Sequence, residues 1–187
     1  MIASPQPQLS AEEYLAWETQ RETRHEYVNG AIIAMTGGSV AHNLLALNLY
    51  SALRPHLREC NCVATVSDVK VQVSSSIYYY PDLVVTCSDR DLQGRQLIQD
   101  PCLIVEVLSP NTAANDRGDK FKNYRNLNSL QEYVLIDSEK ISVERYRRGE
   151  GWMWLYHPYT AGDTLILESL EFECAIDQVY EDVPLEP

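Results

Sequence analysis

Leu103-Ile104-Val105-Glu106-Val107-Leu108 is the stretch of this chain that decides its fold. A continuous run of apolar residues is typical of a strand that is covered on both faces of a sheet. Glu106 lies inside that run, and an ionised carboxylate is costly to bury unless something pairs with it. A structural arginine could be the partner, and so could a metal ion. The stretch therefore predicts a buried strand that carries one acid in need of a partner.

The segments on either side of this strand indicate how it is connected. Ser109-Pro110 ends the strand predicted at 102–108, a helix over about 114–127 follows, and the next predicted strand covers 132–137. A strand–helix–strand unit of this kind predicts a right-handed crossover between parallel strands. On the N-terminal side, a polar loop over 88–100 separates this unit from an apolar strand at 82–87.

The rest of the chain predicts further elements around this unit. Ser10 and Glu13 form a capping box for a short helix over about 10–18, and Asn29-Gly30 predicts a hairpin with a type I′ turn. A long helix begins near residue 40, and Pro55 predicts a kink or an early end. We expect residues 1–8 to be loose and further strands at 62–66, 69–73, 141–147, 151–156 and 164–168. The order predicts a single α/β domain over 1–187, in which helices flank a mixed central sheet with an extra N-terminal hairpin and extra C-terminal strands.

Composition limits the classes of protein to which the chain can belong. It has 187 residues, of which 45% are hydrophobic and 22% charged, as is typical of a globular protein. No apolar run approaches the ~20 residues of a membrane span, and the N-terminus shows no secretory signal. The net charge of −12 argues against tight nonspecific DNA binding. A nucleic-acid role would therefore depend on a local basic patch, a bound metal or a dimer.

The five cysteines form neither a disulfide framework nor a zinc motif. Cys60 and Cys62 are spaced C-x-C rather than C-x₂₋₄-C, and Cys87, Cys102 and Cys174 are scattered. We therefore expect buried, reduced thiols and a cytoplasmic location.

Asp82 is the second acid that begins or interrupts an apolar run, in Tyr80-Pro81-Asp82-Leu83-Val84. Alone, it is typical of a residue at the start of a strand that caps a backbone amide. Together with Glu106 it makes a hard-oxygen metal site plausible, because Mg²⁺ commonly uses one or two carboxylates plus water and substrate phosphate. The backbone carbonyl of Val107 could add a further ligand.

Lys120 and Glu26 are the remaining candidate site residues. Arg117, Lys120 and Tyr124 are spaced to share one helix face. That face could be a solvated basic stripe, or Lys120 could point back over the strand ends and stabilise charge on a phosphate. Glu26 is by default a surface strand residue, but it could be a third acid of the site. His42 is expected to be structural or to support a ligand.

Two further groups of residues receive a structural interpretation. The aromatic run Tyr78 to Tyr80 could stack on bases, but tyrosine is also common in strands. Arg145, Arg147 and Arg148 are expected to form a solvated strand end. The sequence contains no Gly-rich phosphate loop with its lysine and no G-x-S-x-G motif, so it gives no support to a P-loop enzyme or a serine hydrolase.

In combination, these motifs resemble a known family. The matching residues are Tyr27-Val28-Asn29-Gly30, His42, Pro81-Asp82, Glu106-Val107-Leu108-Ser109-Pro110, Asp116 with Lys120 and Tyr124, and Glu132 to Asp137. Over residues 10 to 160 the chain is similar to the Uma-two family of restriction endonucleases, which belongs to the PD-(D/E)xK nuclease superfamily.

The resemblance implies a restriction-endonuclease-like core and assigns roles to the candidate residues. Asp82 and Glu106 would bind the metal, and Glu26 would be the early acid of the site. The superfamily places a lysine two residues after the second acid, but Leu108 holds that place here. In the family that this chain resembles, the lysine moves to the next helix, where it would be Lys120.

These observations predict a Mg²⁺-dependent endonuclease acting on DNA, with Mn²⁺ as a second usable metal. Metal-activated water is the usual nucleophile of such enzymes. By analogy, a homodimer would allow both strands of a duplex to be cut. The net charge and the missing lysine at position 108 leave an alternative open, a catalytically inactive binding or assembly module that keeps the nuclease fold. A hydrolase of another phosphoester is a third reading.

Overall fold

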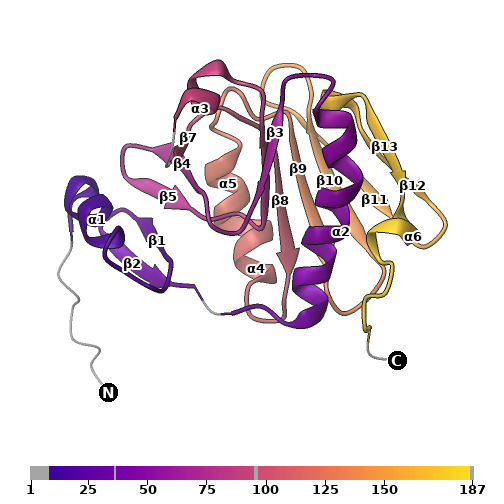
Figure 1. The fold of residues 1–187 in the computed structure, drawn as a ribbon, viewed down its shortest axis with the longest axis horizontal. Helices are drawn as coiled ribbons and strands as arrows, with labels where there is room; N and C mark the ends of the chain where they lie inside the picture. The colour runs from indigo at the N-terminus through magenta and orange to yellow at the C-terminus, as the bar shows by residue number, and fades with distance from the viewer. Residues whose placement is uncertain (1–8, 36, 95–96, 186–187) are drawn as a thin grey trace.

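The computed structural model describes residues 9–35, 37–94 and 97–185 (Figure 1). The helices are α1 (Ala11–Glu18), α2 (Val40–Leu57), α3 (Asp89–Gln93), α4 (Ala113–Asn115), α5 (Phe121–Tyr124) and α6 (Ile176–Val179). A π-helical turn, Asp116–Lys120, lies between α4 and α5, and a 3₁₀ turn covers Glu168–Leu170. The strands are β1 (His25–Val28), β2 (Ala31–Ala34), β3 (Val63–Val66), β4 (Lys70–Ser74), β5 (Ile77–Tyr79), β6 (Leu83–Thr86), β7 (Leu97–Ile98), β8 (Pro101–Leu108), β9 (Glu132–Asp137), β10 (Val143–Arg148), β11 (Trp154–Tyr159), β12 (Thr164–Leu167) and β13 (Phe172–Ala175).

A six-stranded sheet with the order β11-β10-β9-β8-β6-β3 forms the centre of the fold. Its strands β8 and β9 are parallel, and they face each other from Leu103 opposite Glu132 to Leu108 opposite Asp137. The segment α4–π turn–α5 connects them, which confirms the predicted parallel crossover between 102–108 and 132–137. All of β8 except Cys102 is buried, as its apolar run predicts.

A second sheet has five strands, in the order β2-β1-β5-β4-β7. Its first hairpin turns at Asn29 and Gly30, whose φ angles of 49° and 96° confirm the left-handed turn that this pair predicts. Ser10 and Glu13 form the predicted capping box at the start of α1. In Figure 1, α1 and this hairpin lie at one end of the molecule, whereas the two-stranded sheet β12–β13 lies at the other.

Both faces of the six-stranded sheet are covered, so the chain forms a layered α/β fold (Figure 1). One face packs against α2, β12–β13 and α6, with Leu49 of α2 fully buried. The other face packs against α5 and the five-stranded sheet, with Tyr124 fully buried. Side chains alternate along a strand, so Glu106 lies on the α5 face together with Ile104 and Leu108. The fold thus confirms the predicted mixed sheet flanked by helices.

Three local predictions differ from the structure. The polar loop predicted over 88–100 contains the helix α3 and the short strand β7, which pairs with β4. Pro55 lies inside the last turn of α2, which ends at Leu57. The helix predicted over 114–127 is divided by the π-helical turn and ends at Tyr124.

The cysteines also differ from the prediction. Cys62 and Cys87 are joined by a disulfide, so the expectation of reduced thiols is wrong for this pair. Because β3 and β6 are antiparallel neighbours, the residue before β3 meets the residue after β6, although 25 positions separate them in sequence. Cys174 is buried, as expected, whereas Cys60 is exposed and Cys102 is half-buried.

Candidate active site

Glu106 points from the middle of β8 toward the helical crossover and meets Lys120 there. The ammonium Nζ of Lys120 lies 3.1 Å from Glu106 Oε1, and the Tyr124 hydroxyl donates to the same oxygen at 3.1 Å. Glu106 is 3% exposed and Lys120 7% exposed, so the contact is almost free of water. The buried acid therefore has a cationic partner, and that partner is the lysine predicted from the next helix rather than an arginine.

Two further acids converge on the same ammonium. Glu26 Oε1 lies 2.8 Å from Lys120 Nζ, and Asp116 Oδ1 lies 3.6 Å from it. Glu26 is buried, so its default interpretation as a surface strand residue is wrong. Within the described residues, Asp116 Oδ1 is buried and has no hydrogen-bond partner. One lysine thus faces three carboxylates and does not satisfy all of them.

The π-helical turn explains why these side chains meet. It places Asp116 and Lys120 on the buried side, four residues apart, and Tyr124 follows after another four. Arg117 instead faces outward and donates to Glu144 Oε1 from Nε at 2.9 Å and Nη2 at 2.6 Å. The predicted shared face of Arg117, Lys120 and Tyr124 is therefore wrong for Arg117. Single π turns are frequent at functional sites, because the extra residue reorients the side chains of one turn.

Asp82 is held just before β6 by two contacts, one to each carboxylate oxygen. The backbone N–H of Val107 donates to Oδ2 at 2.7 Å, and His42 Nε2 lies 2.9 Å from Oδ1. The first contact is the backbone cap that the Pro-Asp pair predicts. The second shows that His42, from the first turn of α2, supports an acid, as expected. We call Glu26, Asp82, Glu106 and Asp116 the acid cluster.

The acid cluster carries more acids than cations, and its pKa values reflect this. Burial raises the pKa of Glu106 well above its ordinary value, and the other three acids raise it further while Lys120 opposes them. Burial likewise raises the pKa of Asp116. For Lys120, burial lowers the pKa, but the surrounding carboxylates outweigh it and hold the pKa well above its ordinary value. In the described part of the chain, Lys120 is the one lysine or arginine that pairs with the cluster.

A cavity of about 250 Å³ opens onto these residues. Residues of α2 and of the segment after β8 line part of it. The five candidate site residues of the sequence analysis line it as well: Glu26, Asp82, Glu106, Val107 and Lys120. A second cavity of about 460 Å³ adjoins it, since both are lined by His42, Asn111 and Thr112. The site therefore lies in a groove that continues past the start of α2, with room for more than one small group.

The donor atoms of the cluster suit a hard divalent cation. Carboxylate oxygens are the ligands that Mg²⁺ prefers, and one or two suffice when water and phosphate complete the shell. The Asp116 oxygen that accepts no hydrogen bond from the described residues and the excess of acids favour an added positive charge. Within residues 9–35, 37–94 and 97–185, no three His, Cys, Asp or Glu side chains are arranged to hold an ion together. The geometry thus fits a site with few protein ligands rather than a closed cage.

Comparisons with known proteins identify the family of this chain. The model of the family Uma2, described as "Putative restriction endonuclease", matches residues 11–177. The uncharacterized protein slr1290 of Synechocystis sp. (strain ATCC 27184 / PCC 6803 / Kazusa) is 41% identical over 179 residues, which are 95% of this chain and 94% of that protein. The uncharacterized protein sll1609 of the same organism is 34% identical over 158 residues, which are 83% of this chain and 89% of that protein.

A solved structure shares the fold. It is described as "a putative nuclease belonging to DUF820 from Anabaena variabilis ATCC 29413", and it superposes with a TM-score of 0.77 at 16% identity, covering 92% of this chain and 97% of the other. The match of the family model over most of the chain shows that this protein belongs to the Uma2 family.

Proposed function

Starting from this membership, we propose that the protein is a divalent-metal-dependent endonuclease that hydrolyses phosphodiester bonds in DNA. The observation that carries the proposal is the convergence of three buried acids on one lysine beside an open cavity that Asp82 also lines. A purely structural cluster would balance its charges, because unpaired buried charge is destabilising. An excess of acids is what a site needs if a cation joins it.

Asp82, Glu106 and the backbone carbonyl of Val107 would hold Mg²⁺ or Mn²⁺. A bound divalent ion supplies a water of lowered pKa and neutralises charge at the scissile phosphate. Val107 contributes in a second way, because its backbone N–H fixes the orientation of Asp82. His42 orients the other oxygen of the same carboxylate, in the manner of a residue that positions a ligand.

Lys120 supplies the positive charge that belongs to the protein itself. Its ammonium carries three donors, and contacts with Glu26 and Glu106 fix its position. A lysine held at this place can orient the attacking water and stabilise negative charge on the phosphate oxygens. Glu106, Glu26 and Asp116 hold Lys120 in place and keep its pKa above the ordinary value against the effect of burial.

The proposed partners follow from this chemistry. DNA is the proposed substrate, a homodimer would present two sites to the two strands, and the cytoplasm is the proposed location. The larger of the two adjoining cavities is lined mainly by uncharged groups such as Ser39, Asn111 and Thr112, together with Glu139. Uncharged polar groups suit a phosphate backbone better than carboxylates do. In the described residues, no helix combines the length and the apolar character that crossing a bilayer requires.

The test is cleavage of plasmid DNA in Mg²⁺ or Mn²⁺ by wild type, Asp82→Asn and Lys120→Met. The matched controls are Asp119→Asn and Lys122→Met. They make the same two changes at exposed positions of the helical segment that carries Lys120. We expect metal-dependent cleavage by wild type and both controls, and none by the two site variants while their circular dichroism stays that of the wild type.

Two results would contradict the proposal. Undiminished cleavage by Asp82→Asn and Lys120→Met would mean that the activity arises elsewhere. Failure of wild type to cleave DNA, RNA or small phosphodiesters with either metal would favour the inactive binding or assembly module. Cleavage of small phosphodiesters alone would replace DNA as the substrate and keep the metal site.

A further inference from the structure

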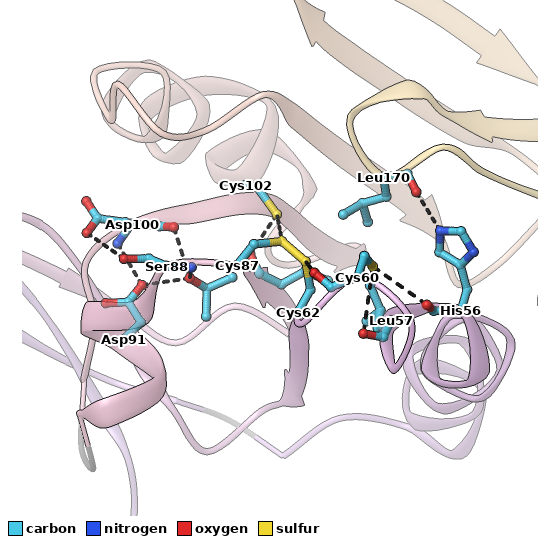
Figure 2. Close-up of a disulfide and its surroundings, with 12 residues drawn as sticks. His56, Leu57, Cys60, Cys62, Cys87, Ser88, Asp91, Asp100, Cys102 and Leu170 are labelled. Carbon is cyan, nitrogen blue, oxygen red and sulfur yellow. Dashed lines mark hydrogen bonds between the residues drawn. A yellow bond between two sulfur atoms is a disulfide. The ribbon is translucent and has the colours of Figure 1, made fainter.

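Three cysteine sulfurs gather at one end of the six-stranded sheet (Figure 2). Cys62, just before β3, is bonded to Cys87, just after β6. The Sγ of Cys102 in β8 lies 3.8 Å from the Sγ of Cys87, which is contact distance. Cys60 lies nearby but turns away, because its Sγ faces the backbone carbonyls of the preceding helix, at 3.6 Å from that of His56. A free thiol thus touches one sulfur of a disulfide.

An irregularity in strand pairing directs Cys102 to this place. β6 and β8 pair with Val85 opposite Leu103 and Thr86 opposite Pro101, so Cys102 has no partner in β6. An extra residue of this kind, a β-bulge, bends the strand and changes the direction of a side chain. The Cys102 Sγ lies 3.3 Å from the Val85 carbonyl oxygen, next to the start of the Cys87 segment. The contact between the two sulfurs is therefore built into the backbone of the sheet.

We propose that Cys102 is the resident nucleophile of a thiol–disulfide exchange site, in which the Cys87 sulfur is bonded alternately to Cys62 and to Cys102. In the exchange, the Cys102 sulfur forms a bond to Cys87 Sγ, and the bond between Cys87 and Cys62 breaks. The thiol proton of Cys102 passes to Cys62, so there is one disulfide and one thiol before and after, and nothing is oxidised or reduced overall. The inference is independent of the proposed nuclease function.

The surroundings of the three sulfurs decide how the site would behave. Cys87 is exposed, whereas Cys62 is buried and Cys102 half-buried. The shared sulfur is thus the one that a thiol from solution reaches first. Burial raises the pKa of the Cys102 thiol to about 11, and the thiolate is the attacking species. Exchange is therefore slow at neutral pH. As long as the pH stays below that pKa, the rate increases about tenfold for each unit by which the pH is raised.

Mapping of disulfides in the intact protein tests the proposal. The purified full-length chain is oxidised with glutathione disulfide, freed of it, held at pH 9, quenched in acid, alkylated with N-ethylmaleimide and digested with pepsin. We expect mass spectrometry to find both the Cys62–Cys87 and the Cys87–Cys102 linkage. Cys60→Ser is the control, and it should leave the two linkages unchanged.

A variant isolates the attack by Cys102. In Cys62→Ser, glutathione disulfide first forms a mixed disulfide at the exposed Cys87, and Cys102 then displaces glutathione to give Cys87–Cys102. We expect this displacement to accelerate about tenfold per pH unit between pH 7 and 9 and to be lost in Cys62→Ser combined with Cys102→Ser. Three results would overturn the proposal. Wild type could show only the Cys62–Cys87 linkage at pH 9, it could form no such linkage on oxidation, or a Cys60–Cys87 linkage could be found. The disulfide mapping of wild type can contradict the proposal by itself, even if a cysteine variant fails to fold.

Discussion

Glu106 in β8 and Glu132 in β9 are buried glutamates on neighbouring parallel strands, but they face opposite sides of the sheet. Glu132 lies on the α2 face, where the backbone N–H groups of Glu168 and Ser169 donate to its two oxygens at 3.2 and 3.1 Å. The hydroxyl of Ser169 also donates to it, and Arg145 Nη1 lies 3.5 Å away. Each oxygen of Glu132 thus has a donor, and the acid shares its arginine, among the described residues, only with the half-exposed Glu168.

The Glu106 side of the sheet is organised differently. Glu106 shares its lysine with Glu26 and Asp116, and an oxygen of Asp116 stays without a hydrogen bond in the described structure. Glu106 also lines the cavity of about 250 Å³, and Glu132 is not among the residues that line it. The comparison teaches that burial of an acid does not by itself indicate function. The balance between acids and their donors separates the two sites, because a satisfied acid stabilises a fold and an unsatisfied cluster leaves room for a cation.

The comparison predicts its largest effect for the activity of Glu106→Gln. The substitution keeps the size of the side chain and removes a proposed metal ligand, so cleavage should fall by at least about a thousandfold, the scale of losing a catalytic group. Plasmid cleavage measured well below the melting temperature checks this, with Glu132→Gln as the matched control. If both variants lost activity equally, the distinction between the two glutamates would be wrong.

The next largest effect is on stability, where we expect Glu132→Gln to be more damaging than Glu106→Gln. Glu132→Gln leaves the buried Arg145 with the half-exposed Glu168 as its remaining charge partner, which should lower the free energy of unfolding by about 3 kcal/mol. Glu106→Gln removes one acid from a crowded cluster, and Lys120 keeps Glu26 and Asp116 as partners, so stability should change by less than about 1 kcal/mol. Urea denaturation of both variants without metal measures the difference. A larger loss in Glu106→Gln than in Glu132→Gln would contradict the charge argument.

A smaller effect is expected for His42→Ala. The imidazole orients Asp82 without lying among the proposed ligands, so its loss should weaken metal affinity by about 10- to 100-fold, as for other residues that position a ligand. Calorimetric titration with Mn²⁺ measures this, and the exposed His157→Ala serves as control. Unchanged affinity in His42→Ala would show that the contact with Asp82 is only structural.

The smallest effect is expected for the ion pair on the outer side of the π turn. Arg117 is 39% exposed at its side chain and pairs with Glu144 in contact with solvent. Arg117→Ala should cost about 0.5 kcal/mol of stability and leave cleavage unchanged, although Arg117 is only three residues from Lys120. Loss of cleavage in this variant would instead mean that Arg117 contributes to the site.

The sequence predicts much of the site because the apolar runs make the acids conspicuous. Glu106 inside a buried strand and Asp82 at the start of another are both found this way, and the structure brings them into one cavity with Glu26, Val107 and Lys120. Asp116 is quoted in the family motif but is given no role at the sequence level. Its spacing of four residues before Lys120 is the signal that could have indicated a shared helix face.

What the sequence does not predict depends on contacts between distant segments. Arg145 is expected at a solvated strand end, but it is 7% exposed and pairs with Glu132 on the neighbouring strand. Arg145 lies two residues after the buried Val143 on β10, so the alternation of side chains places it on the buried face. Only the register of β9 against β10 shows which acid it meets. The sequence also misses the Cys62–Cys87 disulfide, because it does not show that β3 and β6 are neighbours. It misses the π turn because one inserted residue is not visible in the spacing of apolar residues along the helix.

We propose that the acid cluster around Lys120, and not the pair of Glu132 and Arg145, is a divalent-metal site. Calorimetric titration of Mn²⁺ into wild type, Glu106→Gln and Glu132→Gln tests it most directly, at a temperature at which all three are folded. We expect Mn²⁺ to bind to wild type and to Glu132→Gln, and to bind at least about tenfold more weakly to Glu106→Gln. Equal affinity in the three proteins, or no binding by wild type, would contradict it.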